Sequence, residues 1–138
     1  MYKRFATEVT IRPDDIDMND HVHNSKYLDY VLFARYDQMG RCYGMPMDEF
    51  VKRGWGWVVK TCSIAFKRPL NLNDRPIVET WLKEFQGSDV TVGFRILRQN
   101  PQKVSAEGEF VYTMVELTTG RAIDVPDWIV KQYSSFVE

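Results

Sequence analysis

Cysteine is scarce in this sequence, and long apolar runs are missing. Only Cys42 and Cys62 occur among the 138 residues, and their spacing fits neither a CxxC motif nor a disulfide framework. No stretch approaches the roughly 18 consecutive apolar residues of a membrane span, and the first residues, Met1–Phe5, lack the apolar run of a secretory signal. These absences argue against a disulfide-stapled scaffold and a membrane-spanning chain. We therefore expect a cytoplasmic protein whose cysteines stay reduced.

Charge of one sign is also missing, since 18 Lys and Arg residues face 19 Asp and Glu residues for a net charge of −1. A near-neutral chain has no electrostatic footprint for nucleic acid, so nucleic acid is not an expected partner. No repeat, low-complexity segment or linker rich in Pro, Gly or Ser divides the chain. With 44% hydrophobic and 14% aromatic residues, the composition is that of a packed core. The sequence predicts one domain over residues 1–138.

One long helix is expected in the first half of the chain. The segment Tyr27–Tyr36 is apolar on nearly every side, which is typical of a helix in a protein interior. Asn24 or Ser25 suits its N-cap, because a short polar side chain can accept a hydrogen bond from a free backbone N–H. Gly40 and Gly44 offer places for the helix to stop.

Periodicity predicts a sheet around that helix. The expected strands are residues 3–12, 55–68, 75–86, 89–99 and 103–118, with a short tail strand after the Thr119-Gly120 turn. A short second helix, Pro46–Arg53, precedes the second strand. Alternation in the fourth strand places Val90, Val92, Phe94 and Ile96 on a single face. In the third strand it separates two faces, Val78, Thr80 and Leu82 on one and Ile77, Glu79, Trp81, Lys83 and Phe85 on the other. One strand, one buried helix and a run of antiparallel strands make an α+β domain.

A single sheet has to wrap such a helix to bury it on most sides. The outer face of that sheet still carries Trp, Phe and Val side chains, so we expect another subunit to cover part of it. The predicted assembly is a homodimer or a homotetramer.

Four acidic residues crowd the loop before the helix: Asp14, Asp15, Asp17 and Asp20. Such loops often only cap a helix and favour its positive end, contributing about 0.5–2 kcal/mol. Asp15, Asp17 and Asn19 also have the 1-3-5 spacing of a calcium loop. That match fails, because Asp20 stands where a glycine belongs and Lys26 where a glutamate belongs.

The same loop holds the only two histidines of the chain, His21 and His23. Their alternate spacing could aim both rings at one metal ion, yet a site would also need Asp or Cys ligands. Imidazoles in loops are more commonly only hydrogen-bonded, so we expect no metal and no cofactor. The remaining interpretation is catalysis by polar groups set against the amino end of a helix, where free backbone N–H groups collect.

The segment Asp17–Tyr27 resembles the Asp-x-Asn-x-His-Val-Asn-Asn-x-x-Tyr signature of acyl-carrier-protein thioesterases. It is also similar to the shorter Asp-containing loop of the 4-hydroxybenzoyl-CoA thioesterase group, and both belong to the hotdog superfamily. Phe66–Leu70 and Asp74–Thr80 resemble that family's strand–turn–strand, and Thr119–Ala122 is similar to its final turn. The resemblance implies the hotdog fold, in which a curved antiparallel sheet of five or six strands wraps one long central helix.

The resemblance also implies an activity, namely hydrolysis of an acyl thioester of coenzyme A or of an acyl-carrier protein, as in fatty acid metabolism. On this resemblance Asp17 is the carboxylate that activates water or attacks directly. The backbone amide of Asn24 is the expected oxyanion donor. His21 would orient Asp17 or share proton transfer, and Asn19 would position water or substrate. How these groups divide the work stays open in the sequence.

Four further residues are expected to contact substrate: His23, Tyr27, Lys67 and Arg68. His23 replaces the first Asn of the family's pair, which retunes the loop. Tyr27 suits the core as well as the site. Lys67 and Arg68 would meet the phosphates of coenzyme A or an acidic carrier protein, although surface cations are usually only solvated. The acidic residue that some family members add from the helix or a later strand has no assignable counterpart.

Three other functions stay open. Cys42 or Cys62 could act as a nucleophile beside a histidine, although a buried structural cysteine is the commoner state. A hotdog hydratase or dehydratase would act on acyl thioesters with His and Asp or Glu placed differently around the helix. A non-catalytic subunit would bind acyl-CoA without turnover.

Overall fold

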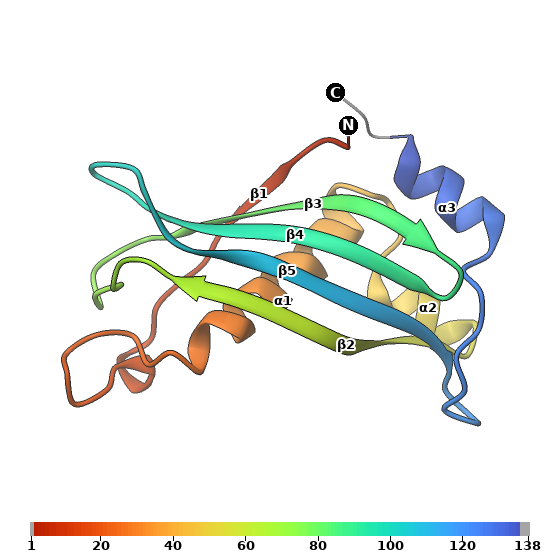
Figure 1. Cartoon of the computed structure of the whole chain (residues 1–138), viewed down its shortest axis with the longest axis horizontal. Coiled ribbons are helices and arrows are strands. Elements are labelled where there is room, and N and C mark those ends of the chain that lie inside the picture. The colour runs from red at the N-terminus through yellow and green to blue at the C-terminus, as the bar shows by residue number, and fades with distance from the viewer. Residues whose placement is uncertain (1, 136–138) are drawn as a thin grey trace.

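A computed structural model of the protein describes residues 2–135 and contains a five-stranded antiparallel sheet (Figure 1). The strands are β1 (Phe5–Glu8), β2 (Trp55–Phe66), β3 (Ile77–Gln86), β4 (Asp89–Arg98) and β5 (Lys103–Glu116). Their order in the sheet is β1-β3-β4-β5-β2. The helices are the 3-10 turn η1 (Pro13–Asp15), α1 (Lys26–Arg41), α2 (Met47–Lys52) and α3 (Asp127–Ser134). The predicted α+β class is confirmed.

The central helix α1 is covered by the sheet on one side only. Its inward side chains Val31, Ala34 and Gln38 are fully buried, whereas Phe33 is 58% exposed and Tyr36 is 55% exposed. The prediction of a helix buried on nearly every side is therefore wrong for this chain by itself. The physical reason is that one sheet lies against one face of the helix (Figure 1), and no other part of residues 2–135 covers the outward face of its middle turns.

The ends of α1 lie near the predicted start and stop residues, with two differences. Ser25 occupies the N-cap position, but its backbone is already helical (φ −66°, ψ −16°) and its side chain makes no capping hydrogen bond. The helix runs through Gly40, so only the later of the two predicted stops is used. The N–H of Cys42 still donates to the Gln38 carbonyl at 2.8 Å. Gly44 then takes a φ of +70°, a conformation that costs glycine little.

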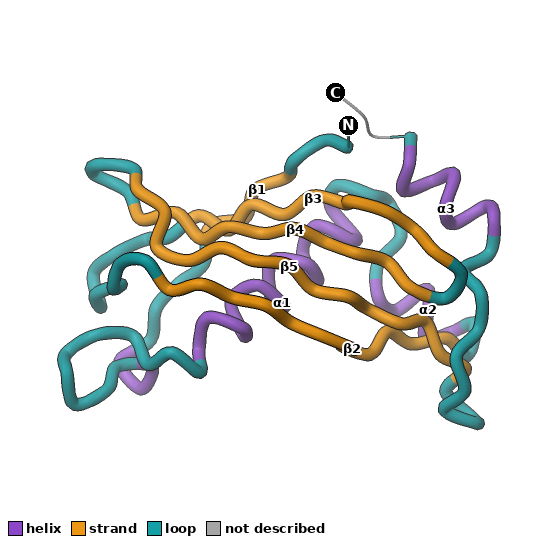
Figure 2. The backbone as a smooth tube through the Cα atoms, in the orientation of Figure 1, coloured by secondary structure: helices purple, strands orange, loops and turns teal. Residues whose placement is uncertain are grey.

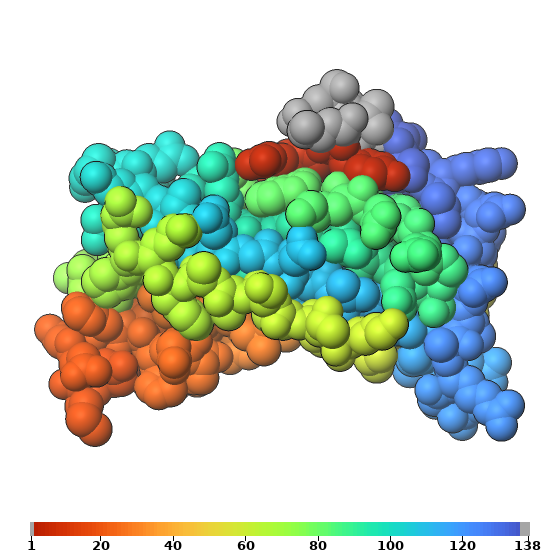
Figure 3. Space-filling view, in the orientation of Figure 1, coloured from red at the N-terminus to blue at the C-terminus, as the bar shows by residue number. Residues whose placement is uncertain are grey.

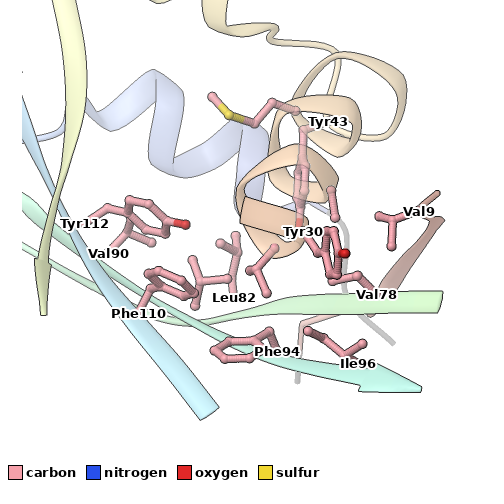
Figure 4. Packing of buried hydrophobic residues seen from close by; sticks show 14 of the residues in the cluster. Val9, Tyr30, Tyr43, Val78, Leu82, Val90, Phe94, Ile96, Phe110 and Tyr112 are labelled. Carbon is pink, nitrogen blue, oxygen red and sulfur yellow. The ribbon is translucent and has the colours of Figure 1, made fainter. Parts of the chain in front are cut away.

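The inner face of the sheet matches the predicted alternation. Figure 4 shows side chains from β3, β4 and β5 pointing toward α1. A two-residue turn at Gly87-Ser88 joins β3 to β4, and pairing of Gln86 with Asp89 sets the register. The inward face is the one that carries two of the predicted sets, and all their members are buried: Val78, Thr80, Leu82, Val90, Val92, Phe94 and Ile96.

The outer face of the sheet, which Figure 3 views directly, carries ion pairs between strands. Lys83 of β3 pairs with Glu109 of β5 at 2.7 Å, and Arg95 of β4 pairs with Glu79 of β3. The half-buried Trp81 lies on the same face, with the guanidinium of Arg4 3.9 Å from its ring centroid, so this face carries ion pairs as well as aromatic surface. About half of the exposed large apolar side chains lie on β2 and on the outward face of α1, among them Val58, Val59, Phe66, Leu32, Phe33 and Tyr36. β2 lies at the edge of the sheet with no strand beyond it (Figure 2).

β1 is shorter than the predicted strand over residues 3–12. It pairs with β3 from Phe5 to Glu8, and the N–H of Val9 still donates to the Pro76 carbonyl at 3.0 Å. Beyond that point the chain turns into η1, whose first residue, Pro13, lacks the N–H that a continuing strand needs. This turn delivers the acidic loop to the amino end of α1.

The predicted tail strand is absent from the described residues, which hold only a single bridge between Val115 and Ala122. The chain instead forms α3, which the sequence prediction misses. The hydroxyl of Tyr133 on α3 donates to the Met45 carbonyl at 3.1 Å, and its ring stacks on Tyr43 with centroids 4.5 Å apart. α3 is thereby held against the connection between α1 and α2. The predicted second helix is confirmed as α2, and no helix among residues 2–135 is long and apolar enough to cross a membrane.

Candidate active site

The loop between η1 and α1 closes on itself through backbone hydrogen bonds. The N–H of Asp17 donates to the His21 carbonyl at 2.8 Å, and the N–H of Asp20 donates to the Asp17 carbonyl at 3.1 Å. Asp20 takes a φ of +64°, in the left-handed region that Asp tolerates better than most residues. The carboxylate Oδ1 of Asp17 accepts the N–H of Asn19 at 2.8 Å. This local turn fixes the direction of the Asp17 side chain.

Asp15 anchors this loop to the protein interior. Its side chain is 6% exposed, and its Oδ2 accepts the hydroxyl of Tyr30 on α1 at 2.6 Å and the N–H of Arg12 at 3.0 Å. Its carbonyl accepts the N–H of His23 at 2.8 Å. Burial, and then the bond to the Asp15 carboxylate, raise the pKa of Tyr30. The sequence prediction misses this anchoring role of Asp15, since the sequence pattern suggested the residue only as a calcium ligand.

The loop forms one wall of an open cleft of about 540 Å³ at the amino end of α1. The opposite wall is the end of β2 and the residues that follow it. Of the eight predicted site residues, only Asn19 is not part of the lining, and it lies exposed on the loop. The structure brings the other seven together: Asp17, His21, His23, Asn24, Tyr27, Lys67 and Arg68.

The carboxylate of Asp17 has one oxygen bound and one available. Oδ1 accepts the N–H of Asn19 and, at 3.4 Å, the N–H of His21. Oδ2 accepts no hydrogen bond from any residue in the described part of the chain. The imidazole of His21 is half-buried in the same lining and makes no hydrogen bond to residues 2–135. In this structure the contact from His21 to Asp17 is therefore made by the backbone, not by the ring.

The start of α1 presents a free backbone donor. Nδ1 of His23 accepts the N–H of Ser25 at 3.1 Å and lies 2.8 Å from the Ser25 hydroxyl, which explains why Ser25 does not cap the helix. An accepting Nδ1 places the proton of the neutral ring on Nε2. The N–H of Asn24 donates to no group within residues 2–135. It precedes the first turn of α1, where the helix dipole carries partial positive charge.

Aromatic side chains close the inner end of the cleft. Tyr27 is buried, and its ring meets Phe66 of β2 edge-on with centroids 5.1 Å apart. Burial raises the pKa of Tyr27, so its phenol stays protonated at neutral pH. Tyr27 therefore belongs to the core and to the cleft wall together.

Two cations stand at the outer end of the cleft with different partners. Lys67 pairs with Glu107 at 3.4 Å. Nη1 of Arg68 donates to the Val104 carbonyl at 3.1 Å, and the guanidinium pairs with no carboxylate of the described residues. Arg68 is thus the cation more available to an anionic ligand.

Neither cysteine lines the cleft. Cys62 is exposed on β2 and Cys42 is half-buried beyond the far end of α1, so the expectation of a buried cysteine is wrong for Cys62. Partial burial raises the pKa of both thiols, which disfavours a thiolate nucleophile. Within residues 2–135 no three His, Cys, Asp or Glu side chains form a group that could hold a metal ion.

Known proteins resemble this chain in sequence and in fold. The model of the thioesterase-like superfamily matches residues 11–133. The long-chain acyl-CoA thioesterase FadM of Escherichia coli is 23% identical over 117 residues, which cover 85% of this chain and 87% of that protein. The solved DHNA-CoA thioesterase of Staphylococcus aureus has a TM-score of 0.87 and 18% identity, with 96% of this chain and 89% of that chain covered. A Thermus thermophilus thioesterase complexed with coenzyme A and zinc has a TM-score of 0.80 and 22% identity, covering 95% and 92%. These structures confirm the predicted hotdog fold.

Proposed function

This chain belongs to the thioesterase-like superfamily, and on that premise we propose that it hydrolyses an acyl-CoA thioester to a free acid and coenzyme A, with Asp17 as the catalytic carboxylate. The observation that carries the proposal is a juxtaposition in one cleft. The available Oδ2 of Asp17 and the free N–H of Asn24 share a lining at the amino end of α1. The Asp17 carboxylate can activate or supply the nucleophile, and the Asn24 N–H can stabilise the oxyanion that forms at the thioester carbonyl.

The chemistry needs little more than these two groups. The thioester oxygen rests on the N–H of Asn24, which is preorganised and lies at the positive end of a helix dipole. In one route Asp17 takes a proton from a water molecule while the water oxygen attacks the carbonyl carbon. In the other, a carboxylate oxygen of Asp17 attacks that carbon, and water then hydrolyses the acyl-enzyme to release the acid. The C–S bond breaks, and the departing thiolate takes up a proton. His21 lines the same cleft and shares the proton transfer, while Asn19 acts through its backbone N–H on Asp17.

The carrier is coenzyme A in this proposal. Two relatives are named as acyl-CoA or DHNA-CoA thioesterases, and a third was solved with coenzyme A. Arg68 and Lys67 stand where phosphates at the mouth of the cleft would lie. Tyr27 and Phe66 supply the apolar wall for the acyl end, and His23 borders the entrance. An acyl-carrier protein presents the same phosphopantetheine thioester, so its acyl form is the second substrate to assay.

The test is a thiol-release assay over short, medium, long and aromatic acyl-CoAs with the Asp17→Asn variant. We expect turnover to fall by about 10²–10⁴-fold, because the substitution removes the charge that activates the nucleophile and keeps the shape. Asp14→Asn is the matched control, since Asp14 is exposed in the same loop and pairs only with Arg12. Near wild-type turnover by Asp17→Asn would refute the assignment.

We also propose that two copies of the chain pair along β2 to form a homodimer. β2 is a 12-residue edge strand, and a long uncovered edge is a template for pairing with another strand. Exposed Phe33 and Tyr36 on α1 extend the same apolar surface. Sedimentation should give twice the 16.2 kDa of one chain. Phe33→Glu should yield monomer. Leu72→Glu, at an exposed apolar residue in the turn between β2 and β3, should not. A wild-type monomer at micromolar concentration contradicts the pairing.

A further inference from the structure

A second cavity, of about 320 Å³, lies at the other end of α1. Its walls come from α1, α2, α3, β2, β5 and the hairpin of β3 and β4. Most of the lining is apolar, with Met39, Trp57 and Ile129 among its side chains. The volume lies at the lower end of the range for pockets that hold small organic molecules, roughly 300–1,000 Å³. Two polar groups in this lining lack the partners that burial normally demands.

The first is the guanidinium of Arg35, on the inward face of α1. Arg35 is 8% exposed, and its Nη1 donates to the hydroxyl oxygen of Thr80 at 3.2 Å. Thr80 is neutral and donates its own proton to Gln38. No carboxylate of the described residues lies within 4.0 Å of the guanidinium. The guanidinium also contacts Tyr43, by a hydrogen bond and at 5.5 Å from the ring centroid, but this partner carries no negative charge either. A buried charge without a counter-ion is costly, so the cavity has a vacancy for one negative charge.

The second is the hydroxyl of Tyr112 on β5. The residue is 8% exposed, and its hydroxyl is buried without a hydrogen-bond partner among residues 2–135. Figure 4 shows this hydroxyl pointing into the space between the sheet and the helices. Burial raises the pKa of Tyr112 to about 12, against a smaller lowering by the charge of Arg35. The phenol therefore stays protonated at neutral pH and can donate a hydrogen bond. It lines the same cavity as the guanidinium of Arg35.

The cavity is separate from the cleft at Asp17. The two share no lining residue. Along α1, Tyr27 in the cleft and Arg35 in the cavity are eight residues apart, which is about 12 Å of helix. Within one chain, a carboxylic acid held at Arg35 would therefore lie outside the Asp17 cleft, although Leu32, Tyr36 and Val59 of the cavity lining also belong to the exposed surface proposed to pair in the dimer.

We propose that this cavity binds the free carboxylate of an apolar monocarboxylic acid. The head group pairs with Arg35 and accepts the Tyr112 hydroxyl, while the hydrocarbon tail lies among Met39, Trp57 and Ile129. A carboxylate suits the vacancy because it carries one negative charge and matches the planar fork of a guanidinium. The proposed thioester hydrolysis releases an acid of this class. Only the source of the ligand rests on the proposed function; its binding in the cavity does not.

Calorimetric titration with octanoate tests the proposal, with 1-octanol as the probe of equal length and no charge. We expect one octanoate per chain and at least about tenfold weaker binding of 1-octanol, because a hydrogen bond to a charged group contributes about 1.5–3 kcal/mol. Tyr112→Phe should weaken octanoate about tenfold and leave 1-octanol unchanged. This variant is preferred to a change at Arg35, because it removes a hydroxyl that has no partner to lose.

Asp17→Asn separates this site from the cleft. It should bind octanoate as tightly as wild type, whatever its effect on thioester turnover. Equal affinity for acid and alcohol, undiminished octanoate binding by Tyr112→Phe, or absence of saturable binding would each overturn the proposal. Loss of octanoate binding in Asp17→Asn would do so too, since it would place the acid in the catalytic cleft.

Discussion

The two ends of α1 handle charge in opposite ways. At the amino end, Asp17, Lys67 and Arg68 line an open cleft where solvent screens their charges. At the carboxyl end, Arg35 is enclosed by apolar side chains without a counter-ion. A solvated charge is cheap to keep and available for chemistry, whereas a buried one is costly until a ligand pairs with it. The same helix thus presents a reactive end and a binding end.

The two ends also differ in how they are assembled. The loop at the amino end is held by hydrogen bonds between neighbours in sequence, such as Asp17 with Asn19 and with His21. The cavity at the carboxyl end draws its walls from seven elements spread over the chain. The amino-end loop is therefore formed by contacts within one short sequence motif, whereas the carboxyl-end cavity exists only once the whole fold has formed.

The largest effect that sharpens this comparison is expected at Asn24. Asn24→Pro removes the free backbone N–H together with the side chain, and the position suits proline because it is the second residue of a turn closed by Lys26 N–H to the His23 carbonyl at 2.9 Å. Loss of one oxyanion donor should lower turnover by about 10²–10³-fold. Steady-state thiol release gives the value of kcat.

Asn24→Ala is the matched control, since it keeps the backbone N–H and removes the side chain. It should retain turnover close to wild type. If the alanine and proline variants lose activity equally, the donor is the Asn24 side chain and not its backbone.

The next effect concerns Asp15, which joins the reactive end to the core. Asp15→Ala leaves the hydroxyl of Tyr30 and the N–H of Arg12 without their acceptor. We expect a loss of about 1–3 kcal/mol in the free energy of unfolding, measured by urea titration. Turnover should fall as well, because without the bond from its carboxylate to Tyr30 the segment at residue 15 loses its anchor, and its backbone carbonyl holds the N–H of His23.

Asp15→Asn keeps an acceptor oxygen and should recover most of both losses. Asp15 is a positioning residue in this account, so kcat should follow the order wild type, Asn, Ala at constant KM. A rise in KM without a change in kcat would instead indicate direct contact with substrate.

The contrast between local motif and assembled cavity explains how far the sequence predicts this protein. The inner face of the sheet follows from period-two alternation, as at Val78 and Leu82, because burial on one side of a strand leaves that trace. The cleft follows from a contiguous run, since Asp17 and Asn24 are placed by turns that close within the run itself. Lys67 and Arg68 enter the cleft prediction through family resemblance, since charge alone does not distinguish them from other surface cations.

Other features depend on contacts that no local pattern records. Asp14 and Asp15 are equivalent in sequence, but only Asp15 meets Tyr30 and is buried. Arg35 and Tyr112 come together only when β5 packs under α1. The outward face of α1 shows the reverse case, since its apolar residues predict a cover that one chain does not supply.

A smaller effect compares two buried tyrosines at the carboxyl end. The hydroxyl of Tyr133 donates to the Met45 carbonyl at 3.1 Å, whereas that of Tyr112 has no partner among residues 2–135. Tyr133→Phe should cost about 1 kcal/mol of unfolding free energy. Tyr112→Phe should cost nothing or stabilise the protein. A sizeable loss in Tyr112→Phe without ligand would mean that its hydroxyl is already satisfied.

The smallest effect is a pH dependence at Asp37 on the same half of α1. The hydrogen bond from Arg41, at 2.8 Å, and one from Thr7 hold the pKa of the Asp37 carboxyl below its usual value. A carboxyl with a lowered folded-state pKa contributes stability above its unfolded pKa of about 3.9 and loses it as pH falls through the folded pKa. Because the pair is partly exposed, we expect at most about 1 kcal/mol.

Unfolding free energies of wild type and Asp37→Asn should therefore differ at pH 7 and converge below pH 4. Groups that titrate in both proteins cancel in this difference. Arg41→Gln provides the second side of a double-mutant cycle, because it removes the first cause of the lowered pKa and keeps a side chain on the helix. In the Arg41→Gln background most of the pH-dependent difference should vanish. If the pH-dependent difference persists in that background, the hydrogen bond from Thr7, and not the ion pair with Arg41, lowers the pKa of Asp37. The ion pair at the carboxyl end of α1 would then contribute little to stability.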